Sequence, residues 1–238
     1  MGRAYSVRKA SIEKNGAVKA RVYSICAKEI YIAAKNGIDP DTNDRLKRLI
    51  EKAKKDQVPN DIIKRAIEKA KGNSGEDYQE VTYEGFGPGA STFIINCLTD
   101  NVNRTVSYVR AAFNKLNKNL GVKGSVLYNY DYLGIVSFNH QNANEIFEHL
   151  INEGLDIIDF EPEGNEISIT ADPSIIYEVK KALEKLIDNL EYSYDEIGLF
   201  PKEEISLVGE EMANFNKLLN ILNEIEDVKN IYHNVRID

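Results

Sequence analysis

Basic side chains that could bind phosphate are concentrated at the start of the chain. Residues 1–72 carry 18 Lys and Arg against nine Asp and Glu, whereas residues 73–238 carry 12 against 29. The stretch 2–21 is the densest, with six cations, one acid and the aromatic ring of Tyr5. This density predicts a surface that binds a nucleic-acid backbone, although solvated Lys-rich helices are the commoner origin of such runs.

The candidate contact residues are cations that fall outside the apolar stripes of the expected helices, together with one aromatic ring that could stack on a base. They are Arg3, Tyr5, Arg8, Lys9, Lys14, Lys19, Arg21, Lys28, Lys35, Arg45, Lys47, Arg48 and Arg104. Arg104 is included because residues 99–105 lead into a helix, and the free N–H groups at a helix start favour an anion. Simple capping of that helix by Asp100 or Asn101 explains the same residues equally well.

Other chemistry has no visible machinery in the sequence. The three histidines are far apart, and no spacing of Cys, His and acids matches a metal site. We therefore expect no metal, no cofactor and no catalytic residue. The Gly-rich stretch 85–89 lies between two expected strands rather than before a helix, which favours a hairpin turn over a phosphate-binding loop. The expected protein is not an enzyme and has no small-molecule substrate.

Three amphipathic helices are expected to present the cations. Their apolar residues recur at helical spacing over 17–36, 42–56 and 60–71. Asn60 is the expected N-cap of the third helix, because it follows the break at Pro59. Together the helices form a small basic domain over residues 1–72.

Alternating strands and helices follow a polar linker at 72–77 and indicate an α+β fold. Residues 133–199 have the order β-α-β-β-α-β of a complete ferredoxin-like unit. The elements around that unit are strands over 78–86, 91–98 and 125–130, a helix over 103–116, a strand over 204–208, a helix over 210–225 and a strand over 228–235. The last three are too few to hold a core alone, so we expect them to pack on the earlier strands.

The predicted organisation therefore has three parts. They are a basic helical domain (1–72), a discontinuous central α/β domain (78–131 plus 202–238) and an inserted ferredoxin-like domain (132–201).

Composition limits the class of protein. Hydrophobic residues make up 42% and charged residues 29%, and no apolar run approaches the roughly 20 residues that a membrane helix needs. Cys26 and Cys97 lie far apart in apolar stretches, which favours buried thiols in a reducing compartment. We expect a soluble cytoplasmic protein without a membrane partner.

Several stretches together resemble the YebC/PmpR family. They are KEIYIAAKNGIDPDTNDRL (28–46), VPNDIIKRAIEKAKG (58–72), YEGFGPGA (83–90), LTDNVNRT (98–105), NLGVKGSVLY (119–128) and VKNIYHNV (228–235). The resemblance implies the same fold: a helical N-terminal domain, a central α/β domain and a ferredoxin-like domain inserted within it. The start of the chain differs, because many members open with a Gly-His-Ser-Lys-Trp-type segment. Only the basic residues and Tyr5 carry over there, as phosphate and stacking contacts.

The resemblance also implies a function without catalysis. Members are described as probable transcriptional regulators that bind DNA and as translation factors. The latter include a mitochondrial activator of cytochrome oxidase synthesis and bacterial members that help ribosomes through proline-rich stretches. We favour RNA and the ribosome, because the net charge of −17 on residues 73–238 repels a duplex lying along the body and no base-reading helix is evident. A DNA-binding transcriptional regulator is the alternative.

Overall fold

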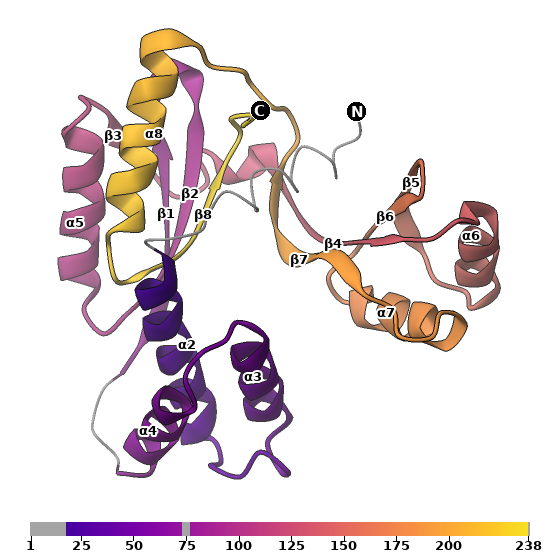
Figure 1. Ribbon diagram of the computed structural model, residues 1–238. Helices are drawn as coiled ribbons and strands as arrows, with labels where there is room; N and C mark the ends of the chain where they lie inside the picture. Colours follow the sequence, from indigo (N-terminus) through magenta and orange to yellow (C-terminus); the bar gives the residue numbers. More distant parts are fainter. Residues whose placement is uncertain (1–17, 73–76, 238) are drawn as a thin grey trace. The chain divides into compact units, whose positions relative to one another are not determined.

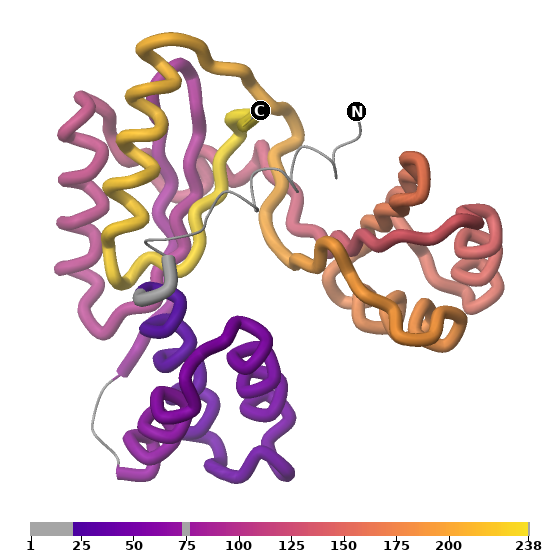
Figure 2. Tube along the Cα trace, in the orientation of Figure 1, coloured from indigo at the N-terminus to yellow at the C-terminus, as the bar shows by residue number. Residues whose placement is uncertain are grey.

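The chain folds into two compact units. The computed structural model describes residues 18–72 and 77–237, with the side chains of residues 18–20 left out. Within these residues, the helical–central unit comprises 18–127 and 207–233, and the ferredoxin-like unit comprises 128–206 and 234–237. Figures 1 and 2 follow the chain through each unit. N-terminal helices and two antiparallel sheets confirm the predicted α+β fold.

The three predicted N-terminal helices are present. They are α2 (Val18–Lys35), α3 (Asp44–Lys55) and α4 (Asn60–Lys71). Asn43 joins the first two, because its side chain accepts a hydrogen bond from Leu46 N at the start of α3 and donates one to Ala33 O in the last turns of α2. The predicted cap of α4 is wrong: Asn60 is the first residue of the helix, and the preceding Pro59 makes no side-chain cap. Proline suits a helix start because it has no N–H to satisfy.

Helix α2 is the centre of the helical bundle. Ile30, Ala33 and Ala34 are buried against α3 and α4, where Leu46 and Ala53 are among the buried partners. Other residues of α2 are buried as well, so the helix is covered on more than the single face that its apolar spacing predicted. The prediction that the cations of α2 face outward is therefore only partly right, because one of them, Lys28, lies on this second buried side.

The central sheet is antiparallel, with the order β3-β1-β2-β8. Its strands and helices are β1 (Gln79–Phe86), β2 (Thr92–Thr99), α5 (Val102–Asn114), β3 (Asn119–Leu120), α8 (Gly209–Asn223) and β8 (Val228–His233). Helices α5 and α8 cover one face of the sheet (Figure 1). Phe93 of β2 packs there against Phe113 of α5 and Phe215 of α8, with ring centroids 5.8 and 5.4 Å away. Since β8 pairs with β2, the end of the chain returns to the first strands.

The Gly-rich stretch 85–89 is a tight turn between β1 and β2, as predicted. Gly87 N donates to Ser91 O across the turn at 2.7 Å, and Gly89 has a φ of +58°, which favours glycine. A Cβ on Gly87 would lie 2.4 Å from the Phe93 ring. These glycines are explained by backbone conformation and close packing.

Glu84 organises the loop that follows α5. Its buried carboxylate accepts hydrogen bonds from the backbone N–H groups of Gly124, Val126 and Leu127 at 2.6, 2.6 and 2.8 Å. Burial by itself would raise the pKa of Glu84, but the three donors outweigh it and hold that pKa below its usual range. The predicted strand over 125–130 is therefore wrong, because these N–H groups bind a side chain instead of a neighbouring strand.

The second unit has the ferredoxin-like order β5-β6-β4-β7, with every neighbouring pair antiparallel. Its elements are β4 (Tyr130–Asn139), α6 (Ala143–Asn152), β5 (Ile157–Glu163), β6 (Glu166–Ala171), α7 (Ile176–Leu186) and β7 (Tyr192–Pro201). Apolar side chains of α6 and α7 are buried with those of β4 and β6 in one core.

The predicted strand over 204–208 is also wrong. Ile205 N donates to Asn234 O and Arg236 N donates to Ile205 O, both at 2.8 Å, so Ile205 pairs with Val235 in an isolated bridge. No ladder continues from that bridge in the described part of the chain. The alternating pattern of this segment belongs to a connection rather than to a sheet.

Replacing Glu84 by Gln should lower the free energy of unfolding by about 2–3 kcal/mol, because a neutral amide cannot satisfy three buried donors as a carboxylate does. The pKa of Glu84 is depressed in the folded state, so the stability it contributes is present above the ordinary carboxyl pKa of about 4.3 and is lost as the pH falls. Urea unfolding at about pH 7 and about pH 4 measures both effects.

Glu80→Gln is the matched control, because Glu80 lies on the same strand with its side chain 68% exposed. It should change the free energy of unfolding by less than about 0.5 kcal/mol. An equal loss for Glu84→Gln at both pH values would contradict the explanation based on its charge.

Candidate nucleic-acid interface

Helix α3 presents a basic surface. Its buried residues are Leu46 and Ala53, while the cations around the rest of the helix are exposed: Arg45, Lys47, Arg48, Lys52, Lys54 and Lys55. None of these six forms an ion pair with a carboxylate of the described residues. The predicted cations Arg45, Lys47 and Arg48 therefore lie together on one helix and are available to an outside anion.

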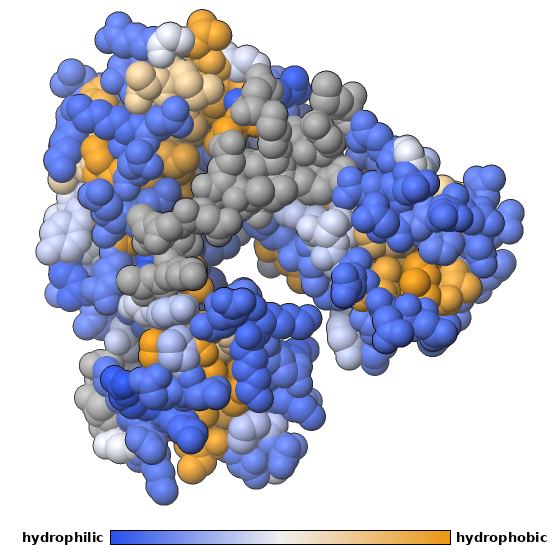
Figure 3. Space-filling model, in the orientation of Figure 1, coloured by the Kyte–Doolittle hydropathy of each residue, from blue (hydrophilic) through white to orange (hydrophobic). Residues whose placement is uncertain are grey.

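Helix α4 adds cations that the sequence analysis did not single out. Lys64, Arg65, Lys69 and Lys71 are all exposed, on the sides of the helix away from Ile63 and Ala66. Arg65 pairs with Asp61 one turn earlier, and the Lys69 ammonium lies 5.9 Å from the centroid of the Tyr31 ring. Their position opposite the apolar stripe was the available signal. Hydrophilic residues predominate on the outer sides of α3 and α4 in Figure 3.

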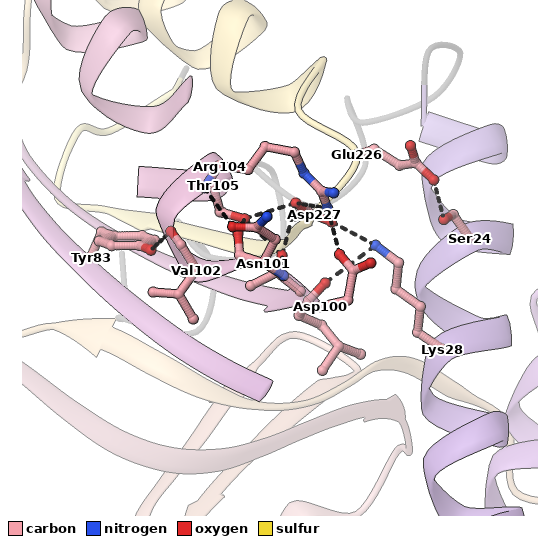
Figure 4. A network of polar contacts seen from close by, with 12 residues as sticks. Ser24, Lys28, Tyr83, Asp100, Asn101, Val102, Arg104, Thr105, Glu226 and Asp227 are labelled. Carbon is pink, nitrogen blue, oxygen red and sulfur yellow. Dashed lines mark hydrogen bonds and ion pairs between the residues drawn. The ribbon is translucent and has the colours of Figure 1, made fainter. Parts of the chain in front are cut away.

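Lys28 does not belong to this surface. Its side chain is buried, and its ammonium donates to Asp227 Oδ1 at 2.9 Å and to Leu98 O at 3.2 Å (Figure 4). The expectation that Lys28 faces solvent is wrong because α2 packs against the start of β8 on the side opposite α3 and α4.

Asp227 is the centre of that contact. Besides Lys28, its carboxylate lies within hydrogen-bond distance of the hydroxyls of Thr99 and Thr105, at 3.1 and 2.8 Å, and of the Arg104 guanidinium at 3.2 Å. Burial by itself would raise the pKa of Asp227, but the bonds to Lys28 and Thr105 outweigh it and lower the pKa. The charge is thus held inside the helical–central unit by a full set of donors.

Arg104 is engaged by carboxylates rather than left open for phosphate. Its guanidinium lies 2.6 Å from Asp100 Oδ1, in addition to the contact with Asp227, and these two bonds raise its pKa. The Asn101 side chain accepts a hydrogen bond from Arg104 N at 3.0 Å and caps α5. Capping, the alternative that the sequence left open, is therefore confirmed, and Arg104 faces a carboxylate pair.

The remaining predicted residues are divided between contacts and undescribed positions. The Arg21 guanidinium, whose pKa burial lowers, donates to Asn223 Oδ1. Lys35 is exposed and its ammonium lies 5.2 Å from the centroid of the Tyr31 ring. The side chain of Lys19 is not described. Five predicted contacts lie outside the described residues: Arg3, Tyr5, Arg8, Lys9 and Lys14.

Metal-ligating side chains do not gather into a site in the described part of the chain. No group of three or more His, Cys, Asp and Glu that could hold a metal is found there. His149 Nε2 lies 2.9 Å from Ala182 O and joins α6 to α7. Burial raises the pKa of the Cys26 thiol to about 11 and that of Cys97 to about 12, as expected for unreactive thiols. None of the described helices is long and apolar enough to cross a membrane.

Known proteins match both the helical bundle and the two sheets. A model of the TACO1/YebC N-terminal domain matches residues 3–73, and a model of the TACO1/YebC second and third domains matches residues 78–235. The chain belongs to the TACO1/YebC family. Two of the stretches that resemble this family, YEGFGPGA (83–90) and LTDNVNRT (98–105), contain Glu84 and Arg104. In this chain both stretches therefore belong to internal polar networks.

Relatives in the TACO1/YebC family match over nearly their whole length. A probable transcriptional regulatory protein of Acholeplasma laidlawii is 47% identical over 237 residues, which is 99% of this chain and 98% of the relative. One from Alteromonas mediterranea is 44% identical over 235 residues and 98% of both. The crystal structure of a conserved hypothetical protein from Aquifex aeolicus, 34% identical, has a TM-score of 0.72 over 92% of this chain and 90% of that one. The names of the Acholeplasma and Alteromonas relatives support a regulator of gene expression.

Lys28→Met should lower the free energy of unfolding by about 3–5 kcal/mol, because it leaves the Asp227 carboxylate buried without its ammonium partner. The double variant Lys28→Met with Asp227→Asn should lose less than the sum of the two single losses. Urea unfolding of all four proteins gives the coupling energy. Lys47→Met is the matched control on exposed α3; additive losses at Lys28 and Asp227 would contradict a direct interaction.

Acidification should weaken the same contact. The pKa of Asp227 is lowered in the folded protein, so its stabilising effect is present above the ordinary Asp pKa of about 3.9 and disappears as the pH falls. The difference in unfolding free energy between wild type and Asp227→Asn should therefore be largest near neutral pH and should narrow towards about pH 3. A difference that grows on acidification would reverse the assigned sign.

Proposed function

We propose that this TACO1/YebC protein is a non-enzymatic nucleic-acid-binding regulator that acts on ribosomal RNA as a translation factor. In this proposal it helps synthesis through difficult, proline-rich stretches. One observation carries the proposal: the cations of α3 are exposed and free of carboxylate partners among the described residues, whereas Lys28 and Arg104 are neutralised internally. An exposed, unneutralised group of cations is the feature that binds a phosphate backbone.

The distribution of charge favours structured RNA as the target. Residues 128–206 carry 18 acidic and four basic residues, a net charge of −14. A long bare duplex that touches both units would be repelled by this acidic part. A target that offers phosphate to the helices, and protein or solvent to the rest, avoids that repulsion. Ribosomes offer such a mixed surface.

A DNA-binding transcriptional regulator is the second candidate, because the relatives carry that name. The exposed side of α3 supplies Arg and Lys, which hold phosphates and can also pair with guanine, but none of its residues is the Asn or Gln that pairs with adenine in the major groove. A helix without residues that read adenine is limited as a reader of DNA sequence, which is the reason that we place DNA second.

The test is co-sedimentation of the purified protein with 70S ribosomes, alongside binding to duplex DNA at the same near-physiological salt. Replacing Arg45, Lys47 and Arg48 together by Gln should weaken ribosome binding about tenfold or more and should reduce its salt dependence, because fewer counterions are released. A matched control replaces three exposed lysines elsewhere by Gln: Lys115, Lys181 and Lys217. This control changes the net charge equally and should bind like wild type.

Binding of one DNA sequence in excess competitor, without ribosome binding, would replace the translation proposal by the transcriptional one. Equal losses in the α3 variant and in the control would show that net charge, rather than the α3 surface, determines binding. If the protein helps ribosomes to synthesise proline-rich stretches, ribosome profiling in cells that lack it should show pauses at runs of proline codons.

A further inference from the structure

We infer that a groove in the helical–central unit holds an unpaired stretch of nucleic acid by stacking a base on Tyr108. This inference rests on the proposed function and adds a site to it. Two pockets of about 280 and 410 Å³ adjoin, because both are lined by Lys28, Tyr78 and Glu226. Together they form one groove, the seam groove. One end lies between α2 and α4, and the other end is lined by α5.

An exposed aromatic ring lies at the α5 end of the seam groove. Tyr108 is 55% exposed and follows Arg104 by one helical turn, so both side chains lie on the same side of α5. A tyrosine this exposed adds little to a core, and the packing of the unit does not require it. Ring faces of this kind stack on bases of any sequence.

Further along, the groove contains a second aromatic wall and reaches the basic surface. Tyr78 contacts Tyr31 edge-to-face, with ring centroids 5.7 Å apart, and the Lys28 ammonium lies 5.7 Å from the Tyr78 centroid. Arg65 and Lys69 of α4 line the other end. A strand whose phosphates lie on the cations of α3 and α4 could therefore continue past Tyr78 to Tyr108. The phosphate contacts would come from α3 and α4, because Lys28 and Arg104 are already engaged by Asp227 and Asp100. Aromatic rings next to such a basic surface are the composition of single-strand binding grooves.

Carboxylates in the groove help to define the ligand. Asp100 and the exposed Glu226 line it beside the cations, and Glu226 accepts a hydrogen bond from the Ser24 hydroxyl at 3.0 Å. These groups oppose a ligand that is only phosphate. They can, however, accept hydrogen bonds from the amino groups of bases. The mixture of rings, cations and carboxylates fits an unpaired nucleotide chain better than inorganic phosphate or a duplex.

The test is fluorescence anisotropy of the full-length protein with a mixed-sequence, labelled oligoribonucleotide of about 12 nucleotides, within the usual site size of single-strand binders. Tyr108→Ala should weaken binding about 5- to 150-fold, the effect expected for one stacked base, without changing the salt dependence. Tyr108→Phe keeps the ring and should bind within about twofold of wild type. Tyr177→Ala is the matched control, because Tyr177 is another helix tyrosine and is 57% exposed.

The site itself can be located with the same RNA carrying 4-thiouridine. Ultraviolet cross-linking and trypsin digestion should label the peptide Thr105–Arg110, which contains Tyr108. The matching oligodeoxyribonucleotide shows whether the groove also accepts DNA, and a duplex of the same sequence should compete poorly.

Three results would overturn the inference: unchanged affinity of Tyr108→Ala, an equal loss in Tyr177→Ala, or no binding of the oligonucleotide by wild type. Each is distinguishable from failure of the proposed function. The α3 variant tests ribosome binding separately, and it would still lose that binding if only the seam groove were wrong.

Discussion

The buried ion pair between Lys28 and Asp227 is the interaction on which the arrangement of the helical–central unit depends. It joins α2 to the loop before β8, and the same carboxylate reaches Thr99, Thr105 and Arg104 of the central part. Burying a carboxylate costs free energy unless its hydrogen-bond and ion-pair partners are complete. Removal of any one partner of Asp227 therefore destabilises the fold. The helices that carry the basic surface are thereby attached to the sheet through a buried polar contact.

Glu84 plays a similar part at the opposite end of β1. Its carboxylate replaces a neighbouring strand as the acceptor for three backbone N–H groups of the loop 121–127. The glycine turn beyond it allows Phe93 to reach α5 and α8. Two stretches that look functional in the sequence, YEGFGPGA and LTDNVNRT, are thus explained largely by the folding of the central part.

Periodicity predicted the order of helices and strands well, because a helix or strand with one buried face shows that face in its spacing. It predicted Arg45, Lys47 and Arg48 as exposed for the same reason. It failed at Lys28, since α2 is covered on two sides and the partner Asp227 lies 199 residues further along the chain. Residues 125–130 include apolar side chains typical of a strand. The N–H groups of Val126 and Leu127, however, donate hydrogen bonds to Glu84, about 40 residues earlier. Neither partner can be found by local spacing.

These internal contacts change how the charge of the chain should be interpreted. The +9 of residues 1–72 includes Lys28, whose charge is neutralised by Asp227 from outside that range. The positive charge that remains accessible in the described residues is therefore concentrated on α3 and its neighbour α4 rather than spread along α2. A concentrated patch on a chain that is otherwise rich in carboxylates attracts a phosphate backbone at that patch and repels it elsewhere. This arrangement determines where a nucleic acid contacts the protein, independently of its base sequence.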